Sequence, residues 1–115
     1  MGNEKSLKKW SYSKVSKLPI KLRRVVGPSM APTFEPETVI LGWGWFKQLV
    51  PGDVIIFAHG DRELVKRIRH IDGQNLFVLG DNLDQSTDSR QFGLISFDRV
   101  IAKIVWPSRA RLTAE

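Results

Sequence analysis

At 115 residues, 42% hydrophobic and 26% charged, the chain has the size and composition of one folded domain rather than of a disordered or fibrous protein. It has no cysteine, which excludes disulfides and thiolate chemistry, and His59 and His70 are not spaced as a ligand pair, so neither a metal ion nor another cofactor is expected. The net charge of +6 is concentrated in residues 1–24, which carry +7 against −1 for the rest, so the balanced body argues against a nucleic-acid partner.

Residues 1–24 are predicted to be a basic N-terminal arm. Its apolar residues recur at loosely helical intervals, at Leu7, Trp10, Val15, Leu18 and Leu22. The arm is either a solvated tail or an amphipathic helix on an anionic membrane, although Pro19 would interrupt such a helix. No apolar run approaches the roughly 20 residues of a membrane-spanning helix, and no signal peptide is evident. We therefore expect a cytoplasmic protein without a transmembrane segment, and leave open a peripheral membrane contact through the arm.

From residue 25 onward the sequence predicts short strands separated by turns. Runs rich in β-branched and aromatic residues occupy 39–41, 54–57, 64–71, 76–79 and 100–106. Turn-forming residues lie between them, and Asp72-Gly73 is typical of a hairpin turn. The pattern predicts a mostly β domain over residues 25–110, a small barrel-like core of short antiparallel strands without an accessory domain. Trp43 and Trp45 share one side of an extended segment, and the core is favoured over an exposed ridge as their location.

The run from Gly27 to Phe34 contains a candidate nucleophile. Pro28 and Pro32 bracket Ser29 and forbid a continuous helix, so the serine is expected on a stiff, extended loop. A stiff loop suits a nucleophile, but the same run is also compatible with a plain turn.

A candidate base lies in the predicted strand 64–71. Strand alternation directs Lys66 to the apolar side and Arg67 and Arg69 to solvent. Burial lowers the pKa of a lysine and makes it a usable base near neutral pH. A lysine that extends its amine to the rim of the core is the alternative.

The polar loop from Gly80 to Gly93 is rich in hydrogen-bonding side chains. Asp88 and Arg90 are expected to form an ion pair that fixes the loop, and Ser86 could hold a lysine amine in place. A surface loop stabilised by its own Asx turns is the alternative.

Together these segments resemble, in order, the conserved boxes of the type I signal peptidases, which are serine–lysine endopeptidases. The matching runs are Ser29-Met30-Ala31-Pro32-Thr33, Pro51-Gly52-Asp53-Val54, Val65-Lys66-Arg67 and Gly80-Asp81-Asn82 through Ser86, Asp88, Ser89 and Arg90 to Phe92-Gly93. The resemblance covers about residues 25–106.

The resemblance implies a role for each matching residue. Ser29 would be the nucleophile, Lys66 its general base, Ser86 the residue that orients the lysine, and Asp88 with Arg90 the support of that loop. The backbone amide of Ser29 would stabilise the oxyanion. Many members have a serine or threonine two residues before the nucleophile, where this chain has Gly27, so a second oxyanion donor is not evident.

The resemblance also implies a mostly β catalytic core and a protein or peptide substrate bound as an added strand. The expected edges are 23–27 and 63–66, with Val25, Val26, Gly27, Leu64 and Val65 in contact with the substrate.

The compact chain is most similar to the subgroup of this family thought to mature nickel-type superoxide dismutase by removing a leader. Processing of secretory preproteins is the alternative within the family. Two readings from other classes are weighed against these: a non-catalytic β-barrel binding module, and a self-cleaving repressor. Ser29 and Lys66 argue against the first, and an arm too short for a helix-turn-helix domain argues against the second.

Overall fold

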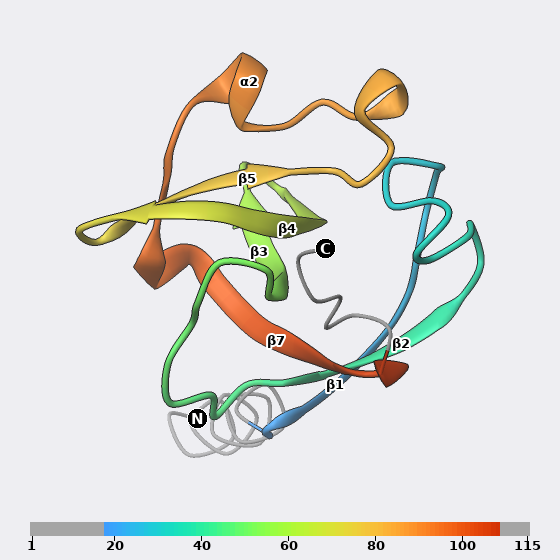
Figure 1. The fold of residues 1–115 in the computed structure, drawn as a ribbon. Coiled ribbons are helices and arrows are strands. Elements are labelled where there is room, and N and C mark those ends of the chain that lie inside the picture. Colours follow the sequence, from blue (N-terminus) through green and yellow to red (C-terminus); the bar gives the residue numbers. More distant parts are fainter. Residues whose placement is uncertain (1–17, 109–115) are drawn as a thin grey trace, which may run out of the picture.

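The computed structural model describes residues 18–108, which form one antiparallel sheet in the order β1-β2-β7-β3-β4-β5-β6 (Figure 1). The strands are β1 (Ile20–Arg24), β2 (Val39–Trp43), β3 (Val54–His59), β4 (Arg62–Asp72), β5 (Asn75–Leu79), β6 (Ile95–Ser96) and β7 (Val100–Trp106). Short helical turns follow β5, namely η1 (Leu83–Gln85) and α2 (Ser89–Phe92), and η2 (Phe97–Arg99) precedes β7.

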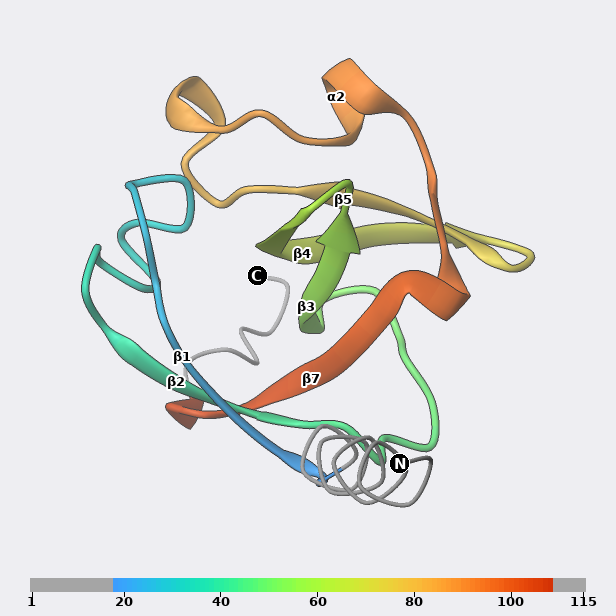
Figure 2. The same cartoon turned by 180° about the vertical axis from the view of Figure 1, so that it is seen from behind.

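The prediction of a mostly β domain of short antiparallel strands is confirmed. The sheet curls strongly, and Figure 2 shows β7 crossing between β2 and β3, but β1 and β6 remain as edges, so the ladder does not close into a barrel. All five predicted strands are present, and no second domain occurs within residues 18–108.

The boundary between arm and domain differs from the prediction. Residues Ile20–Arg24, assigned to the arm, form β1 and pair with β2 from Ile20 opposite Trp43 to Arg24 opposite Val39. The sheet therefore begins about five residues earlier than residue 25. Residues 1–17 of the predicted arm and residues 109–110 of the predicted domain lie outside the described residues.

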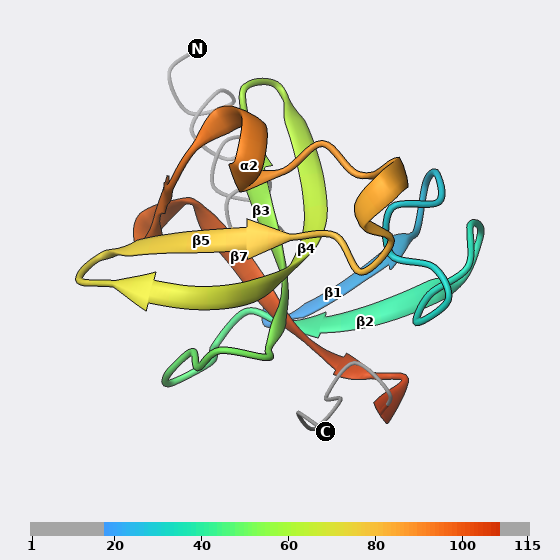
Figure 3. The ribbon, with the colours of Figure 1, turned by 45° about the horizontal axis from the view of Figure 1, so that its top comes forward.

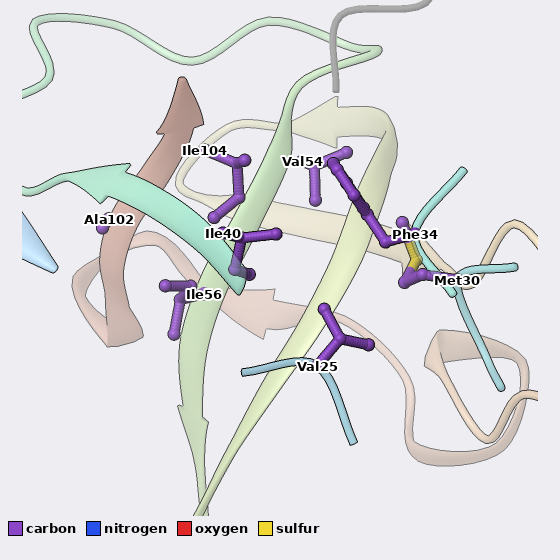
Figure 4. Close-up of a cluster of buried hydrophobic side chains, with 8 residues drawn as sticks. All are labelled: Val25, Met30, Phe34, Ile40, Val54, Ile56, Ala102 and Ile104. Atoms are coloured by element: carbon purple, nitrogen blue, oxygen red, sulfur yellow. The ribbon is translucent and has the colours of Figure 1, made fainter. Parts of the chain in front are cut away.

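The core has two parts, one on each face of β3. One cluster comprises Val25, Met30, Phe34, Ile40, Val54, Ile56, Ala102 and Ile104 (Figure 4). The other comprises Leu49, Ile55, Phe57, Ile68, Leu76, Val78 and Ile95. Because successive side chains of β3 enter opposite clusters, its four buried residues read as one continuous apolar run.

Two glycines set the hairpins on either side of β4. Gly60 (φ 65°) lies between His59 and Arg62, which pair as the last residues of β3 and the first of β4. Gly73 (φ 63°) turns β4 into β5, as Asp72-Gly73 predicts. A positive φ at the first central residue is the geometry that glycine supplies in two-residue hairpin loops.

The two tryptophans do not lie in the core, where the sequence placed them. Trp45 is 65% exposed and Trp43 packs edge-on against it, with ring centroids 6.1 Å apart. Gly42 occupies the inward position beside Trp43, and there a Cβ would lie 2.8 Å from the Ala102 Cβ. The close approach of β7 leaves no room for large rings on the inner face.

Candidate active site

Ser29 lies on the loop between β1 and β2, and its neighbours anchor it. Met30 and Phe34 are buried in the core cluster of Figure 4, and the amide of Phe34 donates to the Met30 carbonyl at 2.9 Å. Ser29 itself is half-buried, and within residues 18–108 neither its amide nor its hydroxyl donates to another group. The loop thus holds a serine rigidly and leaves its amide and hydroxyl available.

Lys66 lies on β4 and is 4% exposed, in agreement with the strand alternation. Its Nζ donates to Ser86 Oγ at 3.0 Å. Burial lowers the pKa of Lys66; the negative charge of Asp88 opposes this shift, and the positive charges of Arg62 and Arg90 add to it. The amine is therefore both desolvated and held by a hydroxyl.

Asp88 anchors this hydroxyl. Its carboxylate is 0% exposed and accepts from Ser86 Oγ at 2.7 Å, the Gly80 amide at 2.9 Å and Arg90 Nε at 2.9 Å. Burial acts to raise the pKa of Asp88, but the hydrogen bonds from Arg90, Gly80 and Ser86 outweigh it and hold the pKa well below its usual range. Because an ionised carboxylate only accepts hydrogen bonds, the Ser86 hydroxyl donates to Asp88 and accepts from Lys66 through an oxygen lone pair.

Ser29 and Lys66 line the same two cavities, of about 260 and 360 Å³. Among the described residues no hydrogen bond joins the side chains of Ser29 and Lys66. Gly80 lies between the backbone of Ser29 and the side chain of Ser86, which accepts from Lys66. A Cβ on Gly80 would lie 2.6 Å from the Ser29 carbonyl oxygen and would also overlap the Ser86 side chain. The absence of a side chain at position 80 lets the serine loop approach the residues that hold the lysine.

The loop after β5 is tied to the Ser29 loop by direct bonds. The Asn82 amide donates to the Ser29 carbonyl at 2.9 Å, and Asn82 Nδ2 donates to the Pro28 carbonyl at 3.1 Å. Figure 3 shows the two loops side by side, where the chain after β5 meets the segment between β1 and β2. These bonds fix the serine relative to the lysine's support.

Asp81 is a second tie, and sequence reasoning missed it. It accepts from Thr33 at 2.6 Å and from Arg67 Nε and Nη2 at 2.8 and 2.7 Å. Arg67 was expected on the solvent side, but its side chain is only 16% exposed. The expectation was wrong because strand alternation does not account for the loop residue Asp81, which pairs with Arg67 on the outer side of β4. The acidic residue beside Gly80 was the signal in the sequence that could have indicated this ion pair.

The predicted substrate-contacting residues lie together on the cavity walls. Val25, Val26, Leu64 and Val65 line the smaller cavity, and Gly27 lines the larger one. Val25 is buried in the core, whereas Val26 is 85% exposed.

Gly27 has a φ of 81°, and a Cβ there would meet no atom of residues 18–108 within 4 Å. Backbone conformation, rather than lack of space, therefore favours glycine at this position.

Two further properties concern metals and membranes. Among residues 18–108 no group of three or more His, Asp or Glu side chains is placed to hold a metal ion. The same part of the chain contains no helix long and apolar enough to cross a membrane.

Comparison with known proteins points to peptidases. Residues 69–108 match the family described as signal peptidase, peptidase S26. Mitochondrial inner membrane protease subunit 2 of Schizosaccharomyces pombe is 29% identical over 108 residues, covering 70% of this chain and 60% of that protein. Subunit 1 from Xenopus tropicalis is 28% identical over 110 residues, covering 70% and 66%. The chain thus spans less than two thirds of either relative, and what it is similar to are peptidases of the signal peptidase type.

Proposed function

We propose that this chain, which resembles type I signal peptidases, is a serine endopeptidase with Ser29 as nucleophile and Lys66 as general base. One observation carries the proposal: a serine whose amide and hydroxyl are unengaged and a lysine that is 4% exposed line the same two cavities. Lowering of the pKa of Lys66 by burial increases the neutral fraction that can accept a proton.

The mechanism follows from these positions. Ser29 Oγ attacks the scissile carbonyl carbon while the neutral Lys66 amine takes its proton, and the lysine then gives this proton to the departing amine. A water molecule then attacks the acyl-enzyme ester while the same amine takes one of its protons, and the lysine returns this proton to Ser29 Oγ as the ester bond breaks. The unengaged amide of Ser29 donates to the oxyanion. Ser86 and Asp88 act as positioning residues, and Arg90 supports Asp88.

The substrate is proposed to bind as a strand between two open edges. Residues 62–66 of β4 pair with β3 on one side, and β5 pairs only with residues from Arg67 onward. Opposite this edge, the Val25 amide donates to the Thr38 carbonyl and the Val25 carbonyl accepts from the Glu37 amide. Because backbone groups alternate in direction along an extended chain, those of Val26 point away from Thr38 and Glu37. Both edges border the smaller cavity, which supports strand addition.

The proposed reaction is removal of an N-terminal leader from a protein precursor. Maturation of nickel-type superoxide dismutase is proposed as the specific role, on the strength of the sequence resemblance to that subgroup. Processing of secretory preproteins is a second candidate, favoured by the match of residues 69–108 to signal peptidases.

The test is to incubate the purified protein with both kinds of precursor and read new N-termini by mass spectrometry. Ser29→Ala and Lys66→Ala are expected to abolish the product, whereas the controls Ser96→Ala, at a half-buried position, and Lys47→Ala, at an exposed one, retain it. Cleavage of secretory precursors alone would move the role to preprotein processing. Cleavage that persists in both Ser29→Ala and Lys66→Ala, or no cleavage of any precursor, would contradict the proposed protease activity. The non-catalytic binding module would then be the favoured interpretation.

A membrane contact is proposed as a further part of the function. Cross-strand pairs place Ile20 beside Trp43 and Leu22 beside Leu41 on one face, where Ile20 and Leu22 are more than half exposed. Exposed tryptophans and the charge of +7 over residues 1–24 suit an anionic membrane surface. We expect sedimentation with vesicles of phosphatidylcholine and phosphatidylserine, weakened by Ile20→Ser with Trp45→Ser and not by the distant Leu94→Ser. Equal sedimentation of all variants would contradict this contact.

A further inference from the structure

The larger of the two cavities beside Ser29 has walls rich in hydrogen-bond donors. Besides Ser29 and Lys66, its polar lining residues are His59, Arg62, Gln85 and Thr87, and none of the described residues that line it is Asp or Glu. Donors without a nearby carboxylate suit an acceptor-bearing ligand.

The β3–β4 hairpin positions two of these donors. His59 and Arg62 pair directly across the hairpin, so their side chains emerge on the same face. Arg99 Nη2 lies 2.8 Å from His59 Nδ1, and the His59 ring packs against Phe92 at a tilt of 36° with centroids 4.2 Å apart. Because a guanidinium only donates, Nδ1 accepts and the ring proton lies on Nε2, which leaves a fixed N–H donor.

Arg62 is the cation that remains available beside Ser29. Within residues 18–108 its guanidinium makes no ion pair, yet it lines both cavities. Among the described residues the only acidic one on either wall is Glu63, and Arg23 donates to it in two hydrogen bonds of 2.6 and 3.1 Å. Glu63 is therefore already paired, and the charge of Arg62 is left for a ligand.

We propose that the larger cavity is a substrate subsite for an acidic side chain, with Arg62 binding the carboxylate and His59 and Thr87 completing its hydrogen bonds. The inference rests on the proposed protease function and adds a substrate class to it: precursors with Asp or Glu next to the cleavage site. A guanidinium can bind a carboxylate through two parallel hydrogen bonds, which gives both affinity and geometric selectivity.

The test is a cleavage profile on a mixed peptide library read by mass spectrometry. Wild type is expected to enrich Asp or Glu at one fixed position near the cut by roughly tenfold over Asn or Gln, the size expected for a charge-assisted bond. Arg62→Gln should remove this preference, and Arg62→Glu should replace it with a preference for Lys or Arg. Arg69→Gln, an exposed arginine on the same strand that lines neither cavity, is the matched control.

Binding of a peptide array to Ser29→Ala protein separates this inference from the proposed reaction. Loss of acidic-peptide binding on adding Arg62→Gln supports the subsite, even if the wild type cleaves nothing and the protease proposal fails. Cleavage without an acidic preference, or a preference that survives Arg62→Gln, overturns the subsite while the protease stands. Neither cleavage nor Arg62-dependent binding overturns both.

Discussion

Lys66 and Ser86 are joined by a 3.0 Å hydrogen bond from the amine to the hydroxyl, whose own proton is directed to Asp88 at 2.7 Å. The direction of the second bond fixes the first, because Ser86 can then offer Lys66 only an acceptor lone pair. The amine is thereby restrained on the wall that it shares with Ser29.

Ser86→Ala is expected to lower kcat by about 10- to 100-fold, because a hydrogen bond to a charged group contributes roughly 1.5–3 kcal/mol. The Lys66 amine would lose its restraint while the core remains intact. Steady-state kinetics with Ser96→Ala as the control measure this, since the Ser96 hydroxyl donates to the exposed Asp98 and Ser96 is not among the described residues that line either cavity. An unchanged kcat would show that Ser86 does not position the lysine.

Gly80→Ala is expected to destabilise the protein by about 1–3 kcal/mol and to abolish most activity. The new Cβ would overlap Ser86 and the Ser29 carbonyl and so separate the two loops. Denaturant unfolding and activity assays check both effects. Gly44→Ala, where the nearest atoms are 3.4 Å away, should behave like wild type. Full activity in Gly80→Ala would contradict the close approach of the loops.

The acid limb of kcat/KM is expected below the ordinary lysine value of 10.5, because burial lowers the pKa of Lys66. Activity rises with pH as the amine becomes neutral. Arg62→Gln removes a positive charge that lowers this pKa, so the limb should move to higher pH, whereas Arg69→Gln should leave it in place. The profile is recorded on a peptide without acidic residues, and a limb that ignores Arg62 would count against Lys66 as the base.

Lys66→Met is expected to abolish activity and to stabilise the fold at neutral pH. The lowered pKa of Lys66 means that the unfolded chain binds more protons between the folded pKa and 10.5, so wild-type stability rises with pH across that interval. The penalty for burying the charge is complete below the folded pKa and absent above 10.5. The gain in Tm should therefore shrink as pH rises. A variant less stable than wild type at every pH would contradict this.

Asp81→Asn is expected to reduce kcat and to lower stability by about 2 kcal/mol, because Thr33 and Arg67 lose a charged acceptor. Asp81 does not touch Lys66, so the acid limb should keep its position. The exposed Asp84→Asn in the same loop is the control. A shifted limb would indicate an effect on the base itself rather than on the placement of the serine loop.

The sequence predicted strands correctly where apolar residues dominate, and it did not predict the strand β1, where they do not. The run Val54–His59 is buried on both faces and reads as a strand by composition alone. In Ile20–Arg24, apolar side chains point outward, while Lys21 and Arg23 are half-buried. Because β1 is stabilised by pairing with β2 and by the Arg23–Glu63 bridge, its local composition resembled a basic arm.

The sequence by itself determined which groups are available: a serine between prolines, a lysine in an apolar alternation, and a loop of acceptors. Only the tertiary structure decided what surrounds them. The desolvation of Lys66, its bond to a hydroxyl twenty residues away, and the approach of Ser29 across Gly80 depend on sheet register and loop packing. Each of these features depends on contacts with residues distant in sequence, so local composition does not predict them.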